Sequence, residues 1–104
     1  MFETNIDQEI RNFHLEIYDG FDVILEFAKS GHIDACGCLG LAYQFGLNCE
    51  IDADKSEYYL KFAAERGHAQ SAHNLGTFYI THNIDLEASK FWFREARSLG
   101  FQPG

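Results

Sequence analysis

Three cysteines and five histidines are the residue types in this chain that could bind a metal ion or act as nucleophiles. Cys36 and Cys38 are two positions apart, so on a helix their thiols point to different sides. The sequence contains neither a C-x-x-C nor an H-E-x-x-H spacing. We therefore expect no metal ion, no cofactor and no catalytic residue. A thiol enzyme that uses Cys38 or Cys49 is kept as a distant alternative.

The histidines and the number of cysteines favour structural roles over catalysis. His32 and His68 each follow a glycine at a predicted helix boundary, which is an architectural position. His73 and His82 are nine positions apart, so they diverge along a straight helix. An odd number of cysteines at low density argues against a disulfide framework. We therefore predict free thiols that are buried or half-buried.

Two stretches of the sequence repeat each other, and this repeat predicts the elements that position these side chains. Segments 31–35 and 39–43 read GHIDA and LGLAY, and segments 67–71 and 75–79 read GHAQS and LGTFY. The two copies are in register at 36 residues. The internal loop of the second copy is three residues shorter, so beyond it the register becomes 33. A period of this length is typical of stacked helix pairs.

Apolar spacing and stop signals predict six helices in one domain over residues 1–104. The expected helices run from about Thr4 to Ile17, over 21–30, over 33–45, from a cap at Asp52 or Asp54 to a stop at Gly67, over 69–81, and from a cap at Asp85 to a stop at Gly100. We divide the domain into an N-terminal cap pair (1–31), two repeats (32–67 and 68–100) and a tail (101–104).

Each repeat carries a glycine inside its first helix, at Gly40 and Gly76. Glycine costs about 1 kcal/mol relative to alanine in a helix interior, so a repeated glycine needs a packing reason. We expect the facing helix of each pair to approach closely at these sites. Around them we expect Leu39 and Leu75 on the inner face, Tyr43 and Tyr79 reaching across to the next element, and Tyr59 and Trp92 between the pairs.

This pattern resembles the Sel-one-like repeat, a relative of the tetratricopeptide repeat. The residues that carry the resemblance are Ala35, Leu39, Gly40, Tyr43, Gly46, Asp52, Lys55, Tyr59, Ala63, Ala64 and Gly67, then Leu75, Gly76, Tyr79, Asp85, Trp92, Ala96 and Gly100. Alanines of the motif are replaced by Ser56, Ser71, Ser89 and Arg97. The resemblance implies an all-α fold, a right-handed α/α superhelix (solenoid) of about three helix pairs. These would be two full repeats and a degenerate N-terminal cap. It also implies a protein-interaction scaffold without catalytic residues or cofactors.

The positions between the signature residues are expected to face outward and to bind a partner. They are Cys38, Leu41 and Phe45 on helix 33–45, and Asn74, Thr77 and Thr81 on helix 69–81. Leu41 and Phe45 lie one turn apart, and neighbouring exposed apolar side chains often mark a binding patch. The alternative is that the N-terminal helix covers them, because short arrays need their faces capped.

The last predicted helix is a second candidate surface. Phe91, Trp92 and Phe93 follow one another, which places aromatic rings on more than one face. An uncapped end of a repeat array tends to associate. Either Phe101 folds back over this end, or another chain covers it. The second case predicts a homodimer through the C-terminal helix.

The chain is acidic, with a formal net charge of −8, and residues 1–34 hold eight acidic and two basic residues. Such a surface repels nucleic acid and anionic membranes and suits a basic protein partner. The same charge also serves solubility alone. The N-terminus is acidic and no apolar run is long enough for a membrane span. We therefore expect a cytoplasmic protein.

Taken together, these features predict a non-catalytic protein–protein interaction module, an adaptor or scaffold. Its partner would bind on the concave face or on the acidic face. The alternative is a stoichiometric inhibitor, for example an immunity protein that neutralises a basic toxin such as a nuclease. The sequence does not decide between the two. They differ in salt dependence, because salt screens the charge steering of an inhibitor.

Overall fold

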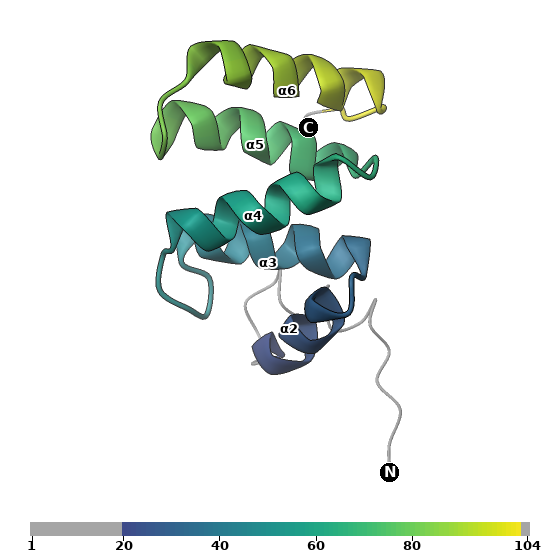
Figure 1. Ribbon diagram of the computed structural model, residues 1–104, viewed down its shortest axis with the longest axis vertical. Coiled ribbons are helices and arrows are strands. Elements are labelled where there is room, and N and C mark those ends of the chain that lie inside the picture. Colours follow the sequence, from purple (N-terminus) through teal and green to yellow (C-terminus); the bar gives the residue numbers. More distant parts are fainter. Residues whose placement is uncertain (1–19, 103–104) are drawn as a thin grey trace.

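The computed structural model describes residues 20–102, and these residues form five α-helices and no strand. The helices are α2 (Phe21–Lys29), α3 (Ile33–Phe45), α4 (Ala53–Ala64), α5 (Ala69–Thr81) and α6 (Leu86–Ser98) (Figure 1). The predicted all-α fold class is confirmed, and the bounds of α3 and α5 agree with those expected. The helix expected from Thr4 lies outside the described residues.

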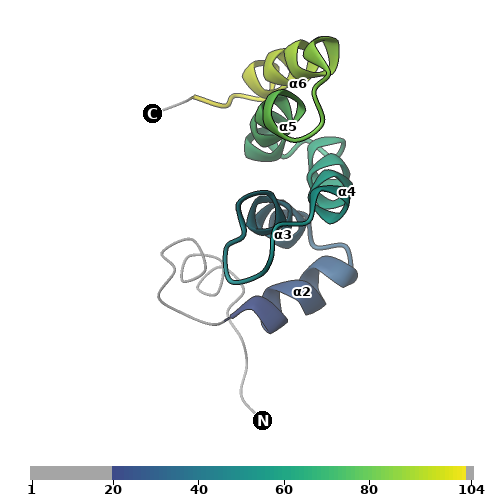
Figure 2. The ribbon, with the colours of Figure 1, turned by 90° about the vertical axis from the view of Figure 1, so that its left-hand side faces the viewer.

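Helices that follow one another in the chain pack against one another. α3 with α4 and α5 with α6 form antiparallel pairs, α2 packs on α3, and α4 packs on α5 (Figures 1 and 2). The first helices of the two pairs, α3 and α5, are also in contact. The described part of the chain is therefore a series of sequential helix pairs.

Three helices end in the same way, at Gly31, Gly67 and Gly100. These glycines have φ angles of 90°, 92° and 95°, in the left-handed region. In each case the glycine N–H donates to the carbonyl three residues back, and the next N–H donates to the carbonyl five residues back. This is the Schellman motif, which satisfies carbonyls that the helix end would leave unpaired. The predicted stops of α2, α4 and α6 are thereby explained.

The beginnings of α3 to α6 are capped by side chains. Asp52 accepts from the Lys55 N–H at 3.0 Å and Asp85 accepts from the Ala88 N–H at 3.1 Å. Asp52 rather than Asp54 is therefore the cap of α4. Asp52 and Asp85 also close their loops identically, because their N–H groups donate to the carbonyls of Tyr43 and Tyr79, at 3.0 and 2.8 Å. The loop before α4 is longer, yet it ends on the same hydrogen bond.

The two helix interiors that contain glycine are sites of close approach, as expected. A Cβ added at Gly40 would lie 2.7 Å from the Leu60 side chain and 2.9 Å from the Leu60 backbone nitrogen. A Cβ added at Gly76 would lie 2.6 Å from the ring of Phe93. Leu60 and Phe93 are 33 residues apart, which is the register of the second half of the repeat. Each pair is therefore joined at the same point.

Buried serines secure this contact in both pairs. The Ser56 hydroxyl donates to the carbonyl of Gly40, and the Ser89 hydroxyl donates to the carbonyl of Gly76, both at 2.8 Å. Both serines are almost completely buried. In the sequence they stand where the motif of the repeat that it resembles has an alanine. In the structure they make one repeated interhelical hydrogen bond, which brings the second helix of each pair against the glycine.

The sequence predicted that the signature tyrosines contact the next element. Tyr79 instead reaches back to the preceding helix, and Tyr43 contacts both the preceding and the next helix. Tyr79 on α5 donates a hydrogen bond to Glu57 on α4. Tyr43 on α3 meets Phe21 of α2 edge to face, with ring centroids 5.9 Å apart. Tyr43 also stacks with Tyr59 of α4 at 6.3 Å. Tyr79 therefore ties its pair to α4, and Tyr43 contacts both α2 and its own partner helix α4.

The buried residues form two clusters that meet at α4. The first cluster joins α2, α3 and Ala63 of α4, with Tyr59 packed against it. The second joins Leu60 and Ala64 of α4 to α5 and α6, with Trp92 packed against it. α4 therefore contributes to both clusters from adjacent turns. Tyr59 and Trp92 therefore each pack against one cluster, and their place between the pairs stays a prediction.

Adding a methyl group at the two helical glycines should have unequal effects. Gly40→Ala forces a Cβ against a backbone atom, which costs about 1–3 kcal/mol of overpacking, and the gain in helix propensity returns only about 1 kcal/mol. Gly76→Ala should cost less, because the half-buried Phe93 ring can turn aside. Urea denaturation measures both, with Gln70→Ala, exposed on α5, as control. Greater stability of Gly40→Ala than of the wild type would contradict the close approach.

Removing either buried serine hydroxyl should destabilise the domain to a similar extent. Ser56→Ala and Ser89→Ala each leave a buried glycine carbonyl without its side-chain donor, at a cost of about 1–2 kcal/mol. Ser98→Ala, on the exposed end of α6, should change the free energy of unfolding by less than about 0.5 kcal/mol. If the two buried variants behave like Ser98→Ala, the hydroxyls do not hold the pairs together.

Candidate functional site

The outward face predicted on α3 and α5 is only partly exposed. Cys38 is 5% exposed and belongs to the first core cluster, so its assignment to an outward surface is wrong. α3 is contacted by α2, α4 and α5, which leaves it few free positions. Leu41 is half-buried, and Phe45, at 51% exposed, is the open apolar side chain of this face.

The corresponding positions of α5 are more accessible. Asn74 and Thr77 are half-buried, and Thr81 is exposed. Gln44, which the sequence analysis did not single out, joins the two helices by donating from Nε2 to the Asn74 carbonyl at 3.3 Å. Its Oε1 is buried and accepts no hydrogen bond from residues 20–102. The α3–α5 face thus combines one open aromatic ring with polar groups of α5.

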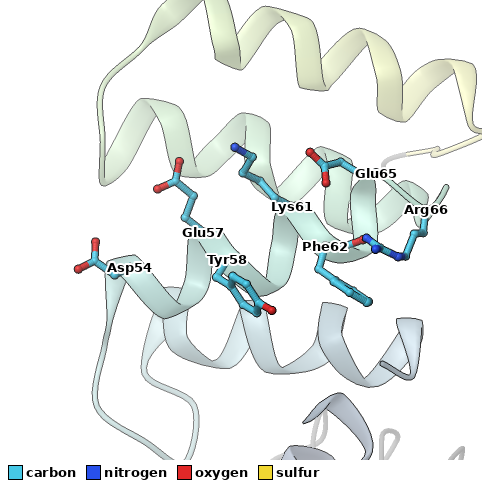
Figure 3. A pocket seen from close by; sticks show the side chains of 7 residues that line it. All are labelled: Asp54, Glu57, Tyr58, Lys61, Phe62, Glu65 and Arg66. Carbon is cyan, nitrogen blue, oxygen red and sulfur yellow. The ribbon is translucent and has the colours of Figure 1, made fainter. Parts of the chain in front are cut away.

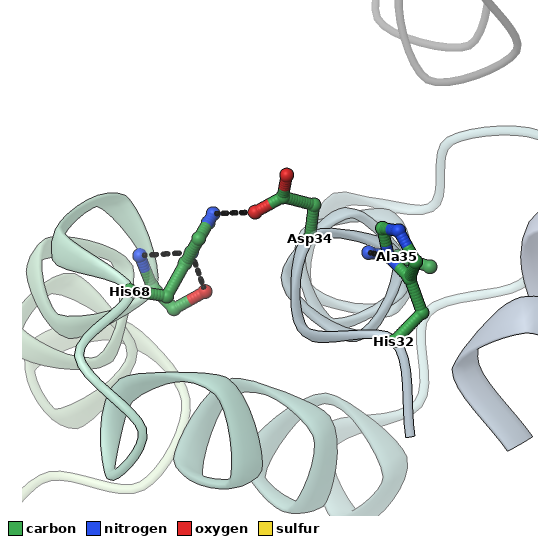
Figure 4. A network of polar contacts seen from close by, with 5 residues as sticks. His32, Asp34, Ala35 and His68 are labelled. Atoms are coloured by element: carbon green, nitrogen blue, oxygen red, sulfur yellow. Dashed lines mark hydrogen bonds and ion pairs between the residues drawn. The ribbon is translucent and has the colours of Figure 1, made fainter. Parts of the chain in front are cut away.

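The glycine-histidine positions are structural, as expected. His32 Nδ1 accepts from the Ala35 N–H at 3.2 Å and His68 Nδ1 accepts from the Ser71 N–H at 3.3 Å, so both histidines cap the helices that follow them. The other ring nitrogen of His68, Nε2, lies 3.3 Å from Asp34 Oδ1 on α3 (Figure 4). His68 therefore links the start of α5 to the start of α3.

The thiols are free and poorly suited to nucleophilic attack. Cys36 and Cys38 are buried and Cys49 is half-buried, as predicted. Burial raises the pKa of the Cys38 thiol to about 12. Burial also raises the pKa of Cys36 and of Cys49, and for Cys49 the nearby Asp52 charge adds to the effect. All three thiols are therefore protonated at neutral pH, the form that is a weak nucleophile.

The side-chain clusters and helix lengths of residues 20–102 bear on other classes of function. No group of three or more His, Cys, Asp and Glu side chains in this part of the chain comes together as ligands for a metal ion. None of its helices is long and apolar enough to cross a membrane.

A groove between α2 and α4 is a concave surface that the sequence did not indicate. No Cα of α2 lies within 8 Å of a Cα of α4. The space between them holds two adjoining cavities of about 400 and 210 Å³. We call this surface the α2–α4 groove, and its main lining residues are Leu25 and Lys29 from α2, Tyr43 at the floor, and Lys55, Tyr58 and Tyr59 from α4.

Aromatic rings and lysines meet in the α2–α4 groove. Tyr43 stacks with Tyr59, and the Tyr58 ring meets Tyr59 edge to face with centroids 5.0 Å apart. The Lys55 ammonium lies 5.3 Å from the centre of the Tyr43 ring. Lys55, Tyr58, Tyr59 and Phe62 share one side of α4 because they are spaced three, four and seven residues apart. Only the fold brings Lys29 opposite them.

The exposed side of α4 separates apolar from charged side chains. In Figure 3 the rings of Tyr58 and Phe62 point toward α3, while Glu57, Lys61 and Glu65 point toward α5. This side forms a shallow hollow of about 490 Å³ that shares Tyr58 and Phe62 with the α2–α4 groove. The aromatic residues of α4 therefore belong to the groove side.

The C-terminal end is partly covered by its own chain. The Phe101 ring stacks on His73 with centroids 4.2 Å apart, so Phe101 does fold back over the end of the second pair. Burial lowers the pKa of His73. Phe91 of α6 stays 47% exposed and contacts Trp92 edge to face. The homodimer through this helix stays a prediction.

Comparisons of the chain with protein-family models, with curated proteins and with solved structures found no match.

The buried thiols predict a loss of stability at high pH. In the unfolded chain the Cys38 pKa returns to about 9 from its folded value of about 12, so the unfolded state loses this proton first. The free energy of unfolding should therefore be insensitive to the Cys38 thiol below pH 9 and fall as pH rises from 9 to 12. Denaturant titrations at fixed pH measure this slope.

Cys38→Ala removes the titrating group and should flatten the slope, although its cavity lowers stability at every pH. Cys49→Ala, at a half-buried thiol, is the matched comparison and should flatten it less. Equal slopes for the wild type and Cys38→Ala would show that this thiol is not buried in the folded state.

Proposed function

We propose that this protein is a non-catalytic protein-interaction module of the adaptor or scaffold type. The observation that carries the proposal is the division between repeated and unrepeated residues. The glycines, serines and leucines that recur in both pairs are buried against one another. The side chains that differ between the pairs include exposed ones, such as Phe45 against Thr81 and Tyr58 against Phe91. A fold that devotes its repeated residues to internal contacts leaves the variable surface available for recognition.

We further infer that the helix pairs belong to the Sel-one-like type and stack as a right-handed superhelix. Support comes from the matched interhelical contacts at Gly40 and Gly76, and from the glycine-ended helices of both repeats. The contact between α3 and α5, the first helices of successive pairs, is the arrangement such a stack requires. Gly37 adds to it, since a Cβ there would lie 2.6 Å from the Ser71 hydroxyl of α5.

The binding surface expected from the sequence is the α3–α5 face, without Cys38. Phe45 supplies an open aromatic anchor, flanked by Leu41 on α3 and by Thr77 and Thr81 on α5. Interfaces draw most of their affinity from a few such anchors. The high pKa of the Cys38 thiol counts against the alternative of a thiol enzyme.

A stoichiometric inhibitor of a basic toxin is the second candidate. It is favoured by the net charge of −8 on a chain of 104 residues. An inhibitor of this kind depends on long-range charge steering, whereas an adaptor anchored by Phe45 depends mainly on apolar contact.

Capture from a lysate of the source cells tests the adaptor proposal. Wild-type protein should retain a specific partner, and Phe45→Lys should lose it, because a charge replaces the apolar anchor. Ile84→Lys, at a 76% exposed side chain in the loop before α6, makes the same change elsewhere and should keep the partner. Equal capture by Phe45→Lys and wild type would contradict a role for this face. An association rate that collapses with added salt would favour the inhibitor.

A further inference from the structure

We propose that the α2–α4 groove is a second binding site, and that it takes an acidic segment of a partner protein with aromatic or long aliphatic side chains. This inference rests on the proposed function as a protein-interaction module. It concerns a different surface, because neither Phe45 nor Leu41 lines the groove.

The charge of the groove is opposite to that of the whole chain. Lys29 on α2 and Lys55 on α4 both line the larger cavity, and both are exposed. Asp54, on the α4 rim, is the only carboxylate among the residues lining the two cavities. Neither lysine forms an ion pair with a carboxylate of residues 20–102. The groove therefore offers two ammonium groups to an acidic ligand from two opposite walls.

The aromatic side chains give the groove its apolar contact area. Tyr58 is 63% exposed and lines both cavities of the groove as well as the hollow on α4. Phe62 lies beside it, and the Arg66 guanidinium is held 3.6 Å above the Phe62 ring. Partly exposed aromatic rings are favoured anchors in interfaces, because they bury a large area with few rotatable bonds. A ligand therefore needs apolar side chains between its carboxylates.

Comparing the two copies of the repeat shows whether the fold itself requires the two lysines. Applying the register of the two copies, Lys29 corresponds to Glu65 and Lys55 corresponds to Ala88. The architecture therefore does not require a cation at either position. The two positive charges therefore occur on α2 and α4, and the corresponding positions, at the end of α4 and on α6, carry none.

The same comparison divides the aromatic residues of the groove into those that recur in the second copy and those that do not. Tyr43 and Tyr59 correspond to Tyr79 and Trp92, so these rings belong to the repeated framework. Phe62 corresponds to Glu95, so this ring is particular to the α2–α4 groove. Cations and an extra apolar ring thus occur together on one groove, whereas Glu65, Ala88 and Glu95 stand at the equivalent positions of the next copy.

A protein segment fits these charges better than a nucleic acid. A polyanion of phosphates would be repelled by a chain of net charge −8, and two lysines neutralise few phosphates. A segment with two or three carboxylates is repelled less at a distance. At 0.15 M salt the long-range field is screened within about 8 Å, so the adjacent lysines dominate once the segment is in the groove.

Peptide display on the full chain tests the proposal. A random 12-residue library is selected at 0.15 M salt on the wild type and on the double variant Lys29→Glu/Lys55→Glu. Wild-type protein should enrich peptides that combine Asp or Glu with Phe, Tyr, Trp or Leu, and the variant should not. Glu at position 55 follows the Asp52 cap and suits the first turn of α4, so the variant should fold.

The best peptide is then titrated by fluorescence anisotropy against matched variants. Lys29→Glu/Lys55→Glu should weaken binding about tenfold or more, because two attractions become repulsions. Tyr58→Ala should also weaken it. Lys90→Glu/Arg94→Glu makes the same charge change on exposed positions of α6 and should stay within about twofold of the wild type.

Each other result overturns the inference. Enrichment of basic peptides, equal selection by wild type and Lys29→Glu/Lys55→Glu, or tighter binding of a uridine oligonucleotide than of the best peptide would exclude an acidic protein segment here. Peptides lost with Phe45→Lys but kept with the groove variant would leave the proposed function standing and remove this site. If no peptide is enriched and the lysate capture also fails, both proposals fall.

Discussion

The described structure depends on one contact, the close approach of two helices at a glycine. A serine hydroxyl on the second helix donates a hydrogen bond to the carbonyl of that glycine. Without a Cβ, Gly40 and Gly76 let the second helix of each pair come within van der Waals contact. The hydroxyls of Ser56 and Ser89 then satisfy a second lone pair on each glycine carbonyl. The free-energy cost of placing a glycine inside a helix is thus offset by the apolar surface that the two helices bury against each other. The bonds from Asp52 and Asp85 to the tyrosine carbonyls fix the connecting loops in the same register.

Much of this fold could be predicted from the sequence, because its signals are local. Helix stops at Gly31, Gly67 and Gly100 and the aspartate caps are short-range hydrogen-bond patterns that residue type reveals. The burial of Cys38 could not be predicted, because it depends on how many helices surround α3. Ser56 and Ser89 looked like lost alanines, since a hydroxyl's partner 16 or 13 residues away leaves no sequence signal. The α2–α4 groove was missed because Lys29 and Tyr58 are brought together only by packing through α3.

The same division between repeated and unrepeated residues organises the functional account. Repeated residues hold pair to pair, and His68 adds a tie between the starts of α3 and α5. Unrepeated residues give two surfaces of the molecule different chemistry. The α3–α5 face carries the open ring of Phe45, and the α2–α4 groove carries lysines among tyrosines. A net acidic chain with a cationic groove can discriminate between partners by charge at that groove. The thiols are packing groups, and burial raises the pKa of Cys38 still further above neutral pH.

The most direct measurement is the set of interproton contacts between the paired helices in solution. In a nuclear Overhauser spectrum of the whole chain, the Gly40 α-protons should show cross-peaks to the Leu60 amide proton, and the Gly76 α-protons to the ring of Phe93, because these groups are in contact. Both sets of cross-peaks should appear, since a glycine is the site of close approach in both pairs. Loss of both sets in a sample that is helical by circular dichroism would contradict the claim that glycine contacts join the helices.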